Sequence, residues 1–267
     1  MEAGSLDLTI GGIAVRLAFL RREGTLPPLV CLHGFGSTKE DYADLALHPG
    51  FEGRGLVLFD APGCGDSTVD DPEAVSIPFL VDTAIAACDA LGVECFHLSG
   101  HSMGGLTALM LAHAHPGRVL SFVDIEGNVA PEDCFLSRQI VEYTAPDAET
   151  FLQGFIARVA ARPEYSSRLY TAALPVKVQP GVIRPIFTSM VDLSDNSPLM
   201  EIFTKLSCSR IFVYGEQNRH LSYLGGLPAR GVEVAEIPLS AHFPMYSNPP
   251  ALWAVMADFI VSSEIAS

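Results

Sequence analysis

The sequence predicts an α/β protein built on a doubly wound, mostly parallel sheet. Two observations predict this class: short apolar segments recur along the 267 residues, and helical patterns lie between them. Continuous apolar runs are typical of parallel strands that helices cover on both faces. Hydrophobic residues make up 49% of the chain and charged residues 18%, which is enough apolar surface for a large core.

The expected strands follow one another along the chain. Gly11-Gly12 separates Leu6–Ile10 from Ile13–Leu20, which predicts an N-terminal β-hairpin. Continuous apolar runs then predict buried strands at Leu29–Leu32, Leu56–Phe59, Phe96–Ser99, Leu120–Ile125, Ile211–Tyr214 and Val232–Ile237.

Capping residues mark the beginnings of the expected helices. Ser37-Thr38-Lys39-Glu40 has the spacing of a capping box, with Ser37 as the N-cap and Glu40 as its partner. Ser76 precedes Ile77-Pro78, and the apolar residues that follow recur on one helix face. Asn248-Pro249-Pro250 begins the last helix, because proline is well tolerated in the first turn.

One segment interrupts the alternation of strands and helices. Residues 127–207 contain helical patterns and no convincing buried strand. We therefore predict a core of residues 1–126 and 208–267, with residues 127–207 inserted as a helical cap. The cap holds seven basic and nine acidic side chains, so most of the chain's acidity lies in the core. Its basic cluster, more simply a solvated helix face than a ligand site, consists of Arg158, Arg162 and Arg168.

Charge and cysteine usage exclude several function classes. The formal net charge of -15 argues against nucleic-acid binding and against attraction to anionic membranes. The longest apolar stretches, such as Leu106–Ala114, are shorter than the roughly 20 residues of a membrane-spanning helix. The six cysteines lack metal-site spacing, and no phosphate loop or dinucleotide motif is present. We expect a cytoplasmic protein without metal or cofactor that acts on a small molecule.

The strongest chemical motif is Gly100-His101-Ser102-Met103-Gly104, a G-x-S-x-G pattern. It lies between an expected strand and an expected helix over 104–114, which is the context that the motif requires. The turn is so tight that glycine is needed on both sides of the serine. It exposes the Ser102 hydroxyl beside a helix N-terminus. We therefore expect Ser102 to be a nucleophile.

Two other segments supply the groups that acyl transfer by a serine needs. His33-Gly34-Phe35-Gly36 follows an expected strand, and the backbone N–H groups of Phe35 and Met103 are candidates for the oxyanion hole. His33 itself more simply supports this loop. A serine hydroxyl also needs a neutral imidazole as its base. Of the eight histidines, only His242 lies between the last expected strand and the last helix.

Together with Asp60-Ala61-Pro62-Gly63-Cys64-Gly65-Asp66-Ser67, these motifs resemble the α/β-hydrolase superfamily. The resemblance covers nearly the whole chain outside the cap, with four motifs in the family's order and spacing. It implies an α/β-hydrolase fold, with an eight-stranded, mostly parallel sheet flanked by helices. It also implies that Ser102, an acidic residue and His242 meet at the C-terminal edge of that sheet. The fold alone implies no substrate.

The acidic residue departs from the family's commonest pattern. Asn218 stands three residues after Gly215, where the family usually has an aspartate. The family's other location follows the strand after the nucleophile helix. There, Glu126 falls where haloalkane dehalogenases and zearalenone-type lactonases place a catalytic glutamate. Asp124, Glu216 and a triad without a charged acid are the alternatives.

These residues favour a serine hydrolase that cleaves a carboxylic ester or lactone through an acyl-enzyme intermediate, with a Ser-His-Glu triad. Haloalkane dehalogenases and epoxide hydrolases of this fold use an aspartate nucleophile, so Ser102 argues against those reactions. Thioester hydrolysis, hydrolysis of a carbon–carbon bond and a ligand receptor or signalling protein are the alternative functions. The candidate pocket residues are Gly34, Phe151, Phe155, Phe187 and Met190.

Overall fold

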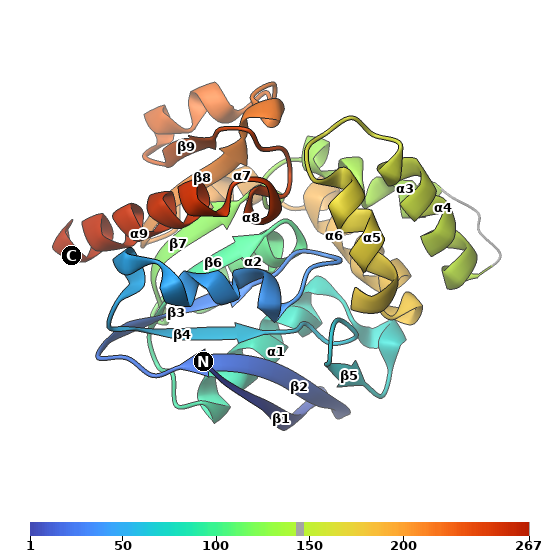
Figure 1. Cartoon of the computed structure of the whole chain (residues 1–267), viewed down its shortest axis with the longest axis horizontal. Coiled ribbons are helices and arrows are strands. Elements are labelled where there is room, and N and C mark those ends of the chain that lie inside the picture. The colour runs from blue at the N-terminus through green and yellow to red at the C-terminus, as the bar shows by residue number, and fades with distance from the viewer. Residues whose placement is uncertain (143–146, 267) are drawn as a thin grey trace.

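The computed structural model describes residues 1–142 and 147–266, and a twisted sheet lies at its centre (Figure 1). The strands are ordered β1-β2-β4-β3-β6-β7-β8-β9, and the short β5 pairs with β2. β2 pairs antiparallel with its neighbours, and the remaining pairs are parallel. The strands are β1 (Glu2–Ile10), β2 (Ile13–Arg22), β3 (Leu26–Leu32), β4 (Arg54–Phe59), β5 (Thr68–Val69), β6 (Phe96–His101), β7 (Val119–Ile125), β8 (Ser209–Gly215) and β9 (Glu233–Ile237). The predicted mostly parallel α/β sheet is confirmed, but within the described residues it has nine strands rather than the expected eight, because the short β5 is added beside β2.

Helices cover both faces of the sheet (Figure 1). One face carries α1 (Ile77–Ala90), α2 (Met103–Ala114) and α7 (Leu199–Thr204). The other carries α8 (Pro244–Ser247), α9 (Pro249–Ala266), η1 (Lys39–Leu47) and η2 (Pro49–Phe51). The remaining 3-10 helices are η3 (Pro72–Ala74), η4 (Pro131–Phe135), η5 (Pro180–Val182), η6 (Glu216–Asn218), η7 (Leu224–Gly226) and η8 (Pro228–Arg230). Among the described helices, none has both the length and the apolar character needed to cross a membrane.

The predicted capping box is displaced by one residue. Thr38 is the N-cap of η1, and its backbone N–H donates to Asp41 Oδ2 at 2.9 Å. Ser37 Oγ donates to the same carboxylate at 2.6 Å. Glu40 instead pairs with Lys39, so the box predicted on Ser37 and Glu40 is wrong. The sequence patterns did not predict the Lys39–Glu40 ion pair, in which Glu40 is engaged instead.

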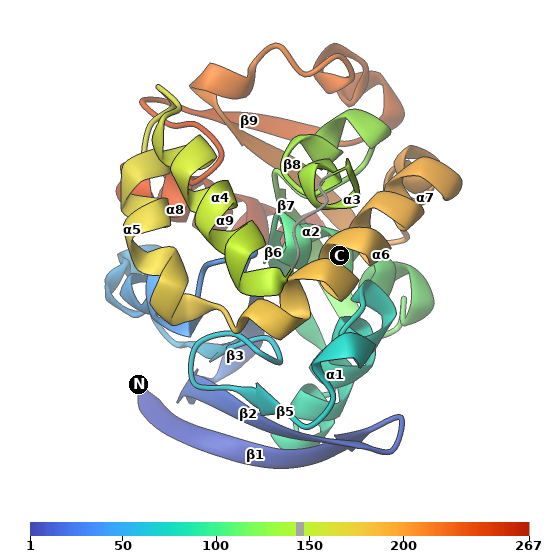
Figure 2. The same cartoon turned by 90° about the vertical axis from the view of Figure 1, so that its right-hand side faces the viewer.

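Four helices gather beyond one end of the sheet, in front of the strands in Figure 2. They are α3 (Arg138–Glu142), α4 (Ala148–Ala160), α5 (Ser167–Lys177) and α6 (Ile183–Asn196). The later α7 packs beside α2 instead, and the Phe203 ring lies 5.9 Å from Phe122 and 6.3 Å from Phe212 of the sheet. We call α3 to α6 the cap helices. The division of the chain at residues 127 and 207 stays a prediction.

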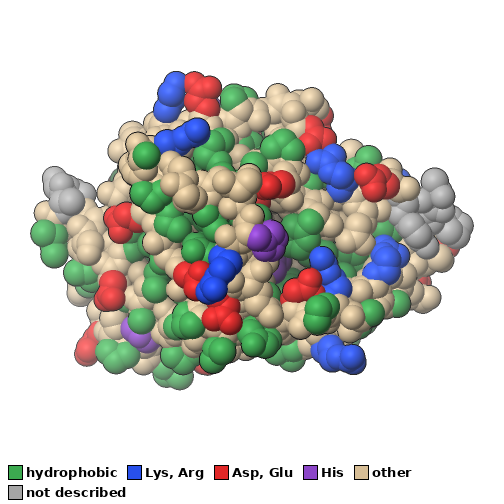
Figure 3. All heavy atoms as spheres, turned by 90° about the horizontal axis from the view of Figure 1, so that it is seen from above, with side chains coloured by type: hydrophobic (Ala, Val, Ile, Leu, Met, Phe, Trp, Pro, Cys, Tyr) green, Lys and Arg blue, Asp and Glu red, His purple; other side chains and the backbone are tan. Residues whose placement is uncertain are grey.

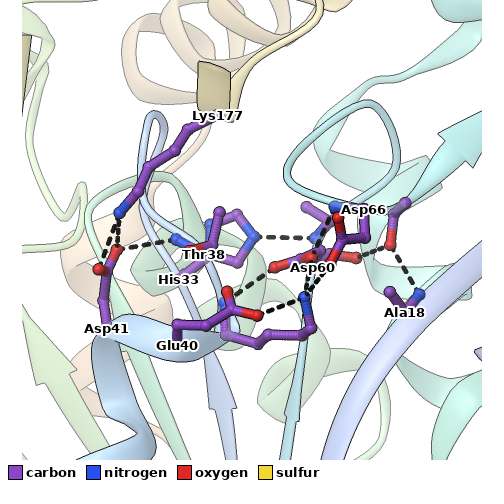
Figure 4. Close-up of polar contacts among 11 residues, drawn as sticks. Ala18, His33, Thr38, Glu40, Asp41, Asp60, Asp66 and Lys177 are labelled. Atoms are coloured by element: carbon purple, nitrogen blue, oxygen red, sulfur yellow. Dashed lines mark hydrogen bonds and ion pairs between the residues drawn. The ribbon is translucent and has the colours of Figure 1, made fainter. Parts of the chain in front are cut away.

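The end of α5 is fastened to the core by backbone and side-chain bonds. Gly65 N donates to Lys177 O, and Gln179 N donates to Gly63 O, both at 2.9 Å. The Lys177 ammonium donates to both Asp41 oxygens, at 2.8 and 2.6 Å (Figure 4). Tyr246 OH donates to Asp41 at 2.7 Å. These bonds hold the cap helices against the loops that follow β3 and β4.

A buried lysine organises the loop after β4. Lys39 is 5% exposed, and its ammonium contacts Asp60 at 2.7 Å, Asp66 at 2.9 Å and Glu40 at 2.6 Å. Burial alone would lower the pKa of Lys39, but hydrogen bonds to the three carboxylates raise it above its usual range. Figure 4 shows these acidic side chains gathered near His33. The network fixes a loop that borders the cap.

Both signs of charge are mixed on one face of the molecule. On the face in Figure 3, acidic and basic side chains lie interspersed among apolar ones. The net charge of -15 is therefore not gathered into a single acidic patch on that face. Mixed surface charge of this kind favours solubility over binding of a large polyion.

We expect Asp60→Asn to destabilise the fold strongly. Asp60 is fully buried and accepts hydrogen bonds from Lys39 Nζ and from two backbone N–H groups. Removing its charge leaves a buried ammonium poorly compensated, which costs about 3–5 kcal/mol. Asp66→Asn is the matched control, since the Asp66 side chain is 79% exposed and its ion pair is screened by water. Urea unfolding measures both variants, and equal losses of stability would contradict this account.

Candidate active site

Ser102 lies at a sharp turn between β6 and α2. Its φ of 51° and ψ of -114° are unusual for a residue with a side chain and cost on the order of 1–3 kcal/mol. A Cβ on Gly100 would collide with the Gly104 carbonyl, and a Cβ on Gly104 would collide with the Leu32 carbonyl. The motif glycines therefore permit the turn. The turn leaves the Ser102 side chain partly exposed at the N-terminus of α2.

A histidine and a glutamate form a close pair at the same edge of the sheet. His242 Nδ1 lies 2.7 Å from Glu126 Oε2. The carboxylate can only accept, so Nδ1 carries the hydrogen, and Nε2 of the neutral ring is free to accept a proton. Glu126 is also held by Gly215 N at 2.8 Å and by Asn218 Nδ2 at 2.7 Å. The glutamate is buried, and three donors satisfy it.

The other carboxylates considered from the sequence have different partners. Asp124 is fully buried, and one of its oxygens accepts Gly127 N at 2.7 Å. Burial raises the pKa of Asp124 well above its usual range. Its bond closes the turn in which Glu126 adopts a φ of 47°. Among the described residues, Glu126 is the carboxylate bonded to the His242 ring, whereas Asp124 and Glu216 are not.

His33 supports the loops beside the site. Its Nε2 accepts Ala61 N, and its Nδ1 donates to Gly34 O, each at 2.8 Å. Burial lowers the pKa of His33, which keeps the ring neutral in this bonding pattern. This position fits a support for the loop that carries Phe35.

His101 has a role that the sequence did not suggest. Its Nε2 donates to the backbone carbonyl of His242 at 2.7 Å, and the two rings lie 4.9 Å apart. Burial lowers the pKa of His101 well below its usual range, so the ring is neutral. The residue before Ser102 thus fixes the backbone of His242. The motif position alone gave no signal for this contact.

Two cavities adjoin these groups. A small one of about 20 Å³, named here the Ser102 pocket, is lined by Ser102, Phe35, Tyr170, Phe187, Met190, Phe135, Leu136, Ser137, Asp133, His242 and Phe243. A larger one of about 270 Å³, named the His242 cleft, is bounded by η4, the end of α4, the segment after it and residues 216–223. His242, Phe135, Leu136, Asp133 and Phe243 border both cavities.

The structure distributes the predicted pocket residues over three positions. Phe187 and Met190 line the Ser102 pocket. Phe155 lies behind it, with its ring 6.4 Å from Phe35 and 6.1 Å from Phe187, and Phe151 stacks on Phe155 from farther away. Gly34 faces His101, because a Cβ there would collide with the His101 ring.

Phe135 and Asp133 are site residues that sequence reasoning missed. The Phe135 ring lies 5.2 Å from the His242 ring, edge to face, and the Arg162 guanidinium lies over the Phe135 ring, 5.7 Å from its centroid. Asp133 accepts Val129 N, Ala130 N and Tyr223 OH, each at 2.8 Å. A single aromatic and a single acid in a loop carry no sequence pattern. Their positions depend on how the cap segment folds back over the core.

Across residues 1–142 and 147–266, no three side chains of the metal-binding types His, Cys, Asp and Glu come together as a metal site. All six cysteines lie in this part of the chain, and all are free thiols. At the sheet edge, His242 is bonded to Glu126 and lines the same pocket as Ser102.

Comparison with known proteins places this geometry in context. The family model of the alpha/beta hydrolase fold matches residues 27–167. Over 120 residues the chain is 36% identical to the pimeloyl-[acyl-carrier protein] methyl ester esterase of Aeromonas hydrophila. That match covers 45% of this chain and 43% of the esterase, so the chain spans less than half of this relative.

Solved structures resemble nearly the whole chain. A thermophilic esterase from Thermogutta terrifontis superimposes with a TM-score of 0.76 at 18% identity, covering 98% of this chain and 99% of the esterase. An N-acyl homoserine lactonase superimposes with a TM-score of 0.74 at 18% identity, covering 98% of this chain and 97% of the lactonase. At this level of identity the likeness establishes the fold alone.

We expect Asp133→Asn to change how stability depends on pH. Burial, opposed by hydrogen bonds from Val129, Tyr223 and Ala130, raises the pKa of Asp133 to about 6. The folded protein therefore keeps this proton to a higher pH than the unfolded chain, and wild type loses stability as pH rises from about 4 to about 6. The variant lacks this loss. The difference in stability, variant minus wild type, should grow across this range and stay constant above it.

Thermal unfolding of both proteins at matched pH values measures that difference. The Asn side chain keeps an oxygen that can accept a hydrogen bond from Tyr223 or from the backbone donors. Comparing the variant with wild type therefore isolates the effect of the charge. A difference that is constant from pH 4 to pH 8 would show that Asp133 ionises equally in both states.

Proposed function

The chain belongs to the α/β-hydrolase fold family, and we propose that it is a serine hydrolase that cleaves a carboxylic ester or lactone. The observation that carries the proposal is the 2.7 Å bond between His242 Nδ1 and Glu126, beside a pocket that His242 shares with Ser102. This arrangement supplies the nucleophile, base and orienting acid of acyl transfer.

The first half of the proposed reaction forms an acyl-enzyme. His242 Nε2 accepts the Ser102 proton while Oγ attacks the substrate carbonyl carbon. The Glu126 carboxylate stabilises the imidazolium that results. The backbone N–H groups of Phe35 and Met103 are proposed to bind the oxyanion of the tetrahedral intermediate. The intermediate then expels the alcohol oxygen, which takes the proton from His242.

The second half releases the acid. His242 removes a proton from water, the water oxygen attacks the acyl carbon, and the Ser102 oxygen departs with that proton. In a lactone the alcohol and acid belong to one molecule, so hydrolysis opens the ring. The two half-reactions together add one water molecule across the ester bond.

Asn218 has a defined part in this proposal. An aspartate at this position would place a second negative charge against Glu126, and one of the two carboxyls would tend to bind a proton. The amide instead donates a hydrogen to Glu126 Oε2, the oxygen that also faces His242. Asn218 and Gly215 therefore hold the Glu126 carboxylate in place against the histidine.

Relatives and free thiols support the rest of the proposal. The neighbours described above include esterases and a lactonase, which favour esters and lactones over thioesters and carbon–carbon bonds as substrates. Six unpaired cysteines fit the reducing conditions of the proposed cytoplasmic location.

The proposal is tested with a panel of esters, lactones and thioesters, together with a fluorophosphonate probe. We expect wild type to hydrolyse oxygen esters or lactones and to react with the probe. Ser102→Ala should lose labelling and at least about 10³-fold in kcat, because the variant lacks the proposed nucleophile. Turnover that survives Ser102→Ala would contradict the nucleophile. If wild type shows no turnover and no labelling, that result would favour a ligand receptor.

A second prediction concerns the acid. Glu126→Gln should lower kcat on the order of 10³–10⁴-fold while leaving the thermal transition near that of wild type, because the amide cannot stabilise the imidazolium. Glu216→Gln is the control, since Glu216 is not bonded to His242 in the described structure. Steady-state kinetics with the best substrate of the panel measures both. A larger loss in Glu216→Gln would reassign the acid.

A further inference from the structure

The two cavities differ in size and border different reacting groups. The Ser102 pocket holds about 20 Å³ and is bordered by Ser102 and Phe35. The His242 cleft holds about 270 Å³ and is bordered by His242 and Glu126 but not by Ser102. A substrate whose carbonyl lies at Ser102 therefore meets little free space on one side and much more on the other.

The chemistry of acyl transfer assigns a side to each half of the substrate. The carbonyl carbon must lie at Ser102 with its oxygen near Phe35, so the acyl group occupies the Ser102 pocket. The departing oxygen must lie near His242, which protonates it. The leaving group consequently extends past His242, toward the cleft.

Phe135 stands between the two cavities. It lines both, its ring rests against His242, and its side chain is 41% exposed. Because an exposed side chain on a short 3-10 helix can change rotamer at small cost, this ring is the movable part of the partition. By contrast, Met190 of α6 is buried in the wall of the Ser102 pocket.

The charges of the cleft select among leaving groups. Its carboxylates include Glu132, Asp133 and Glu164, and its guanidinium, Arg162, is paired with Glu164 at 3.2 Å. Glu164 Oε2 is buried and has no hydrogen-bond partner within the described residues. An anionic group entering this space would be repelled, whereas a hydroxyl or an ammonium would find acceptors.

We propose that the His242 cleft binds the leaving group of esters that join a short acyl group to a larger, uncharged or cationic alcohol, and that Phe135 controls its entry. This inference rests on the proposed serine hydrolase function. It selects against coenzyme-like leaving groups that carry phosphates. It makes Phe135 a specificity residue for the alcohol and Met190 one for the acyl chain.

Two ester series measured on two variants test the assignment. The acyl series is 4-nitrophenyl acetate, butanoate and octanoate. The alcohol series is phenyl acetate and 2-naphthyl acetate, each rate divided by its rate of hydroxide hydrolysis. In wild type, kcat/KM should fall at least about tenfold from acetate to octanoate. Phe135→Ala should raise the naphthyl-to-phenyl ratio about tenfold, and Met190→Ala should instead raise the octanoate-to-acetate ratio.

The charge selection is tested with two further acetate esters, both measured on the wild-type protein. The acetate ester of 4-hydroxybenzoate should be hydrolysed more slowly than the acetate ester of a phenol that bears a trimethylammonium group. Added salt should reduce the difference between the two rates. Equal rates for the two at low salt would overturn the charge selection. Phe135→Leu, which keeps an apolar side chain on η4, replaces Phe135→Ala if the alanine variant does not fold.

The outcomes separate this inference from the proposed function. If the fluorophosphonate probe does not label Ser102 and no ester turns over, the proposed function fails and this inference fails with it. If labelling and turnover occur but octanoate is preferred, the cavity assignment alone is overturned. The cavity assignment is also overturned if Phe135→Ala raises the octanoate-to-acetate ratio and Met190→Ala raises the naphthyl-to-phenyl ratio.

Discussion

The hydrogen-bonded carboxylate of Glu126 is the constraint on which the site depends. Glu126 follows β7, and its partners come from the end of β8, from η6 and from the loop after β9. A buried carboxylate is costly unless donors surround it, and three donors do so here. The continuous β8–η6 segment and the loop after β9 must therefore both reach the end of β7 before this group is satisfied. His101, from β6, adds a bond to the backbone of His242, so the proposed base is held by both its side chain and its main chain.

The parallel sheet brings Ser102 and Glu126 to the same level. β6 and β7 pair in a register that places His101 beside Ile125, the last residue of each strand. Ser102 and Glu126 are the first residues after these two strands. Both then turn sharply with positive φ, which stops each strand and redirects the chain. Ser102 N donates to Ile125 O, and Glu126 N donates to Val213 O, each at 3.0 Å. Backbone bonds of the sheet thus continue up to the two residues and oppose the strain of their conformations.

Sequence patterns predicted the features that depend on residues close together in the chain. Apolar runs located the buried strands, and the glycines around Ser102 located the turn, because each depends on residues adjacent in the chain. The pairing of Glu126 with His242, expected by resemblance, is visible as a contact only when β7 and the loop after β9 meet. The contacts of Phe135 and His101 join distant segments and left no periodic signal. The contact of Asp41 with Lys177, 136 residues away, likewise joins distant segments.

The two sides of the cap differ in how firmly they are held. At the end of α5, backbone bonds to Gly63 and Gly65 and the Asp41–Lys177 ion pair fix the cap to the core. Leu174 and Tyr170 of α5 also pack so closely on Gly36 that a Cβ there would collide with them. Movement of α5 would therefore disturb the loop that carries Phe35. Phe135 of η4, by contrast, contacts the His242 ring edge to face and is 41% exposed. Because ring contacts are weaker than this network of charged and backbone bonds, access to Ser102 is easier through Phe135 than through displacement of the whole cap.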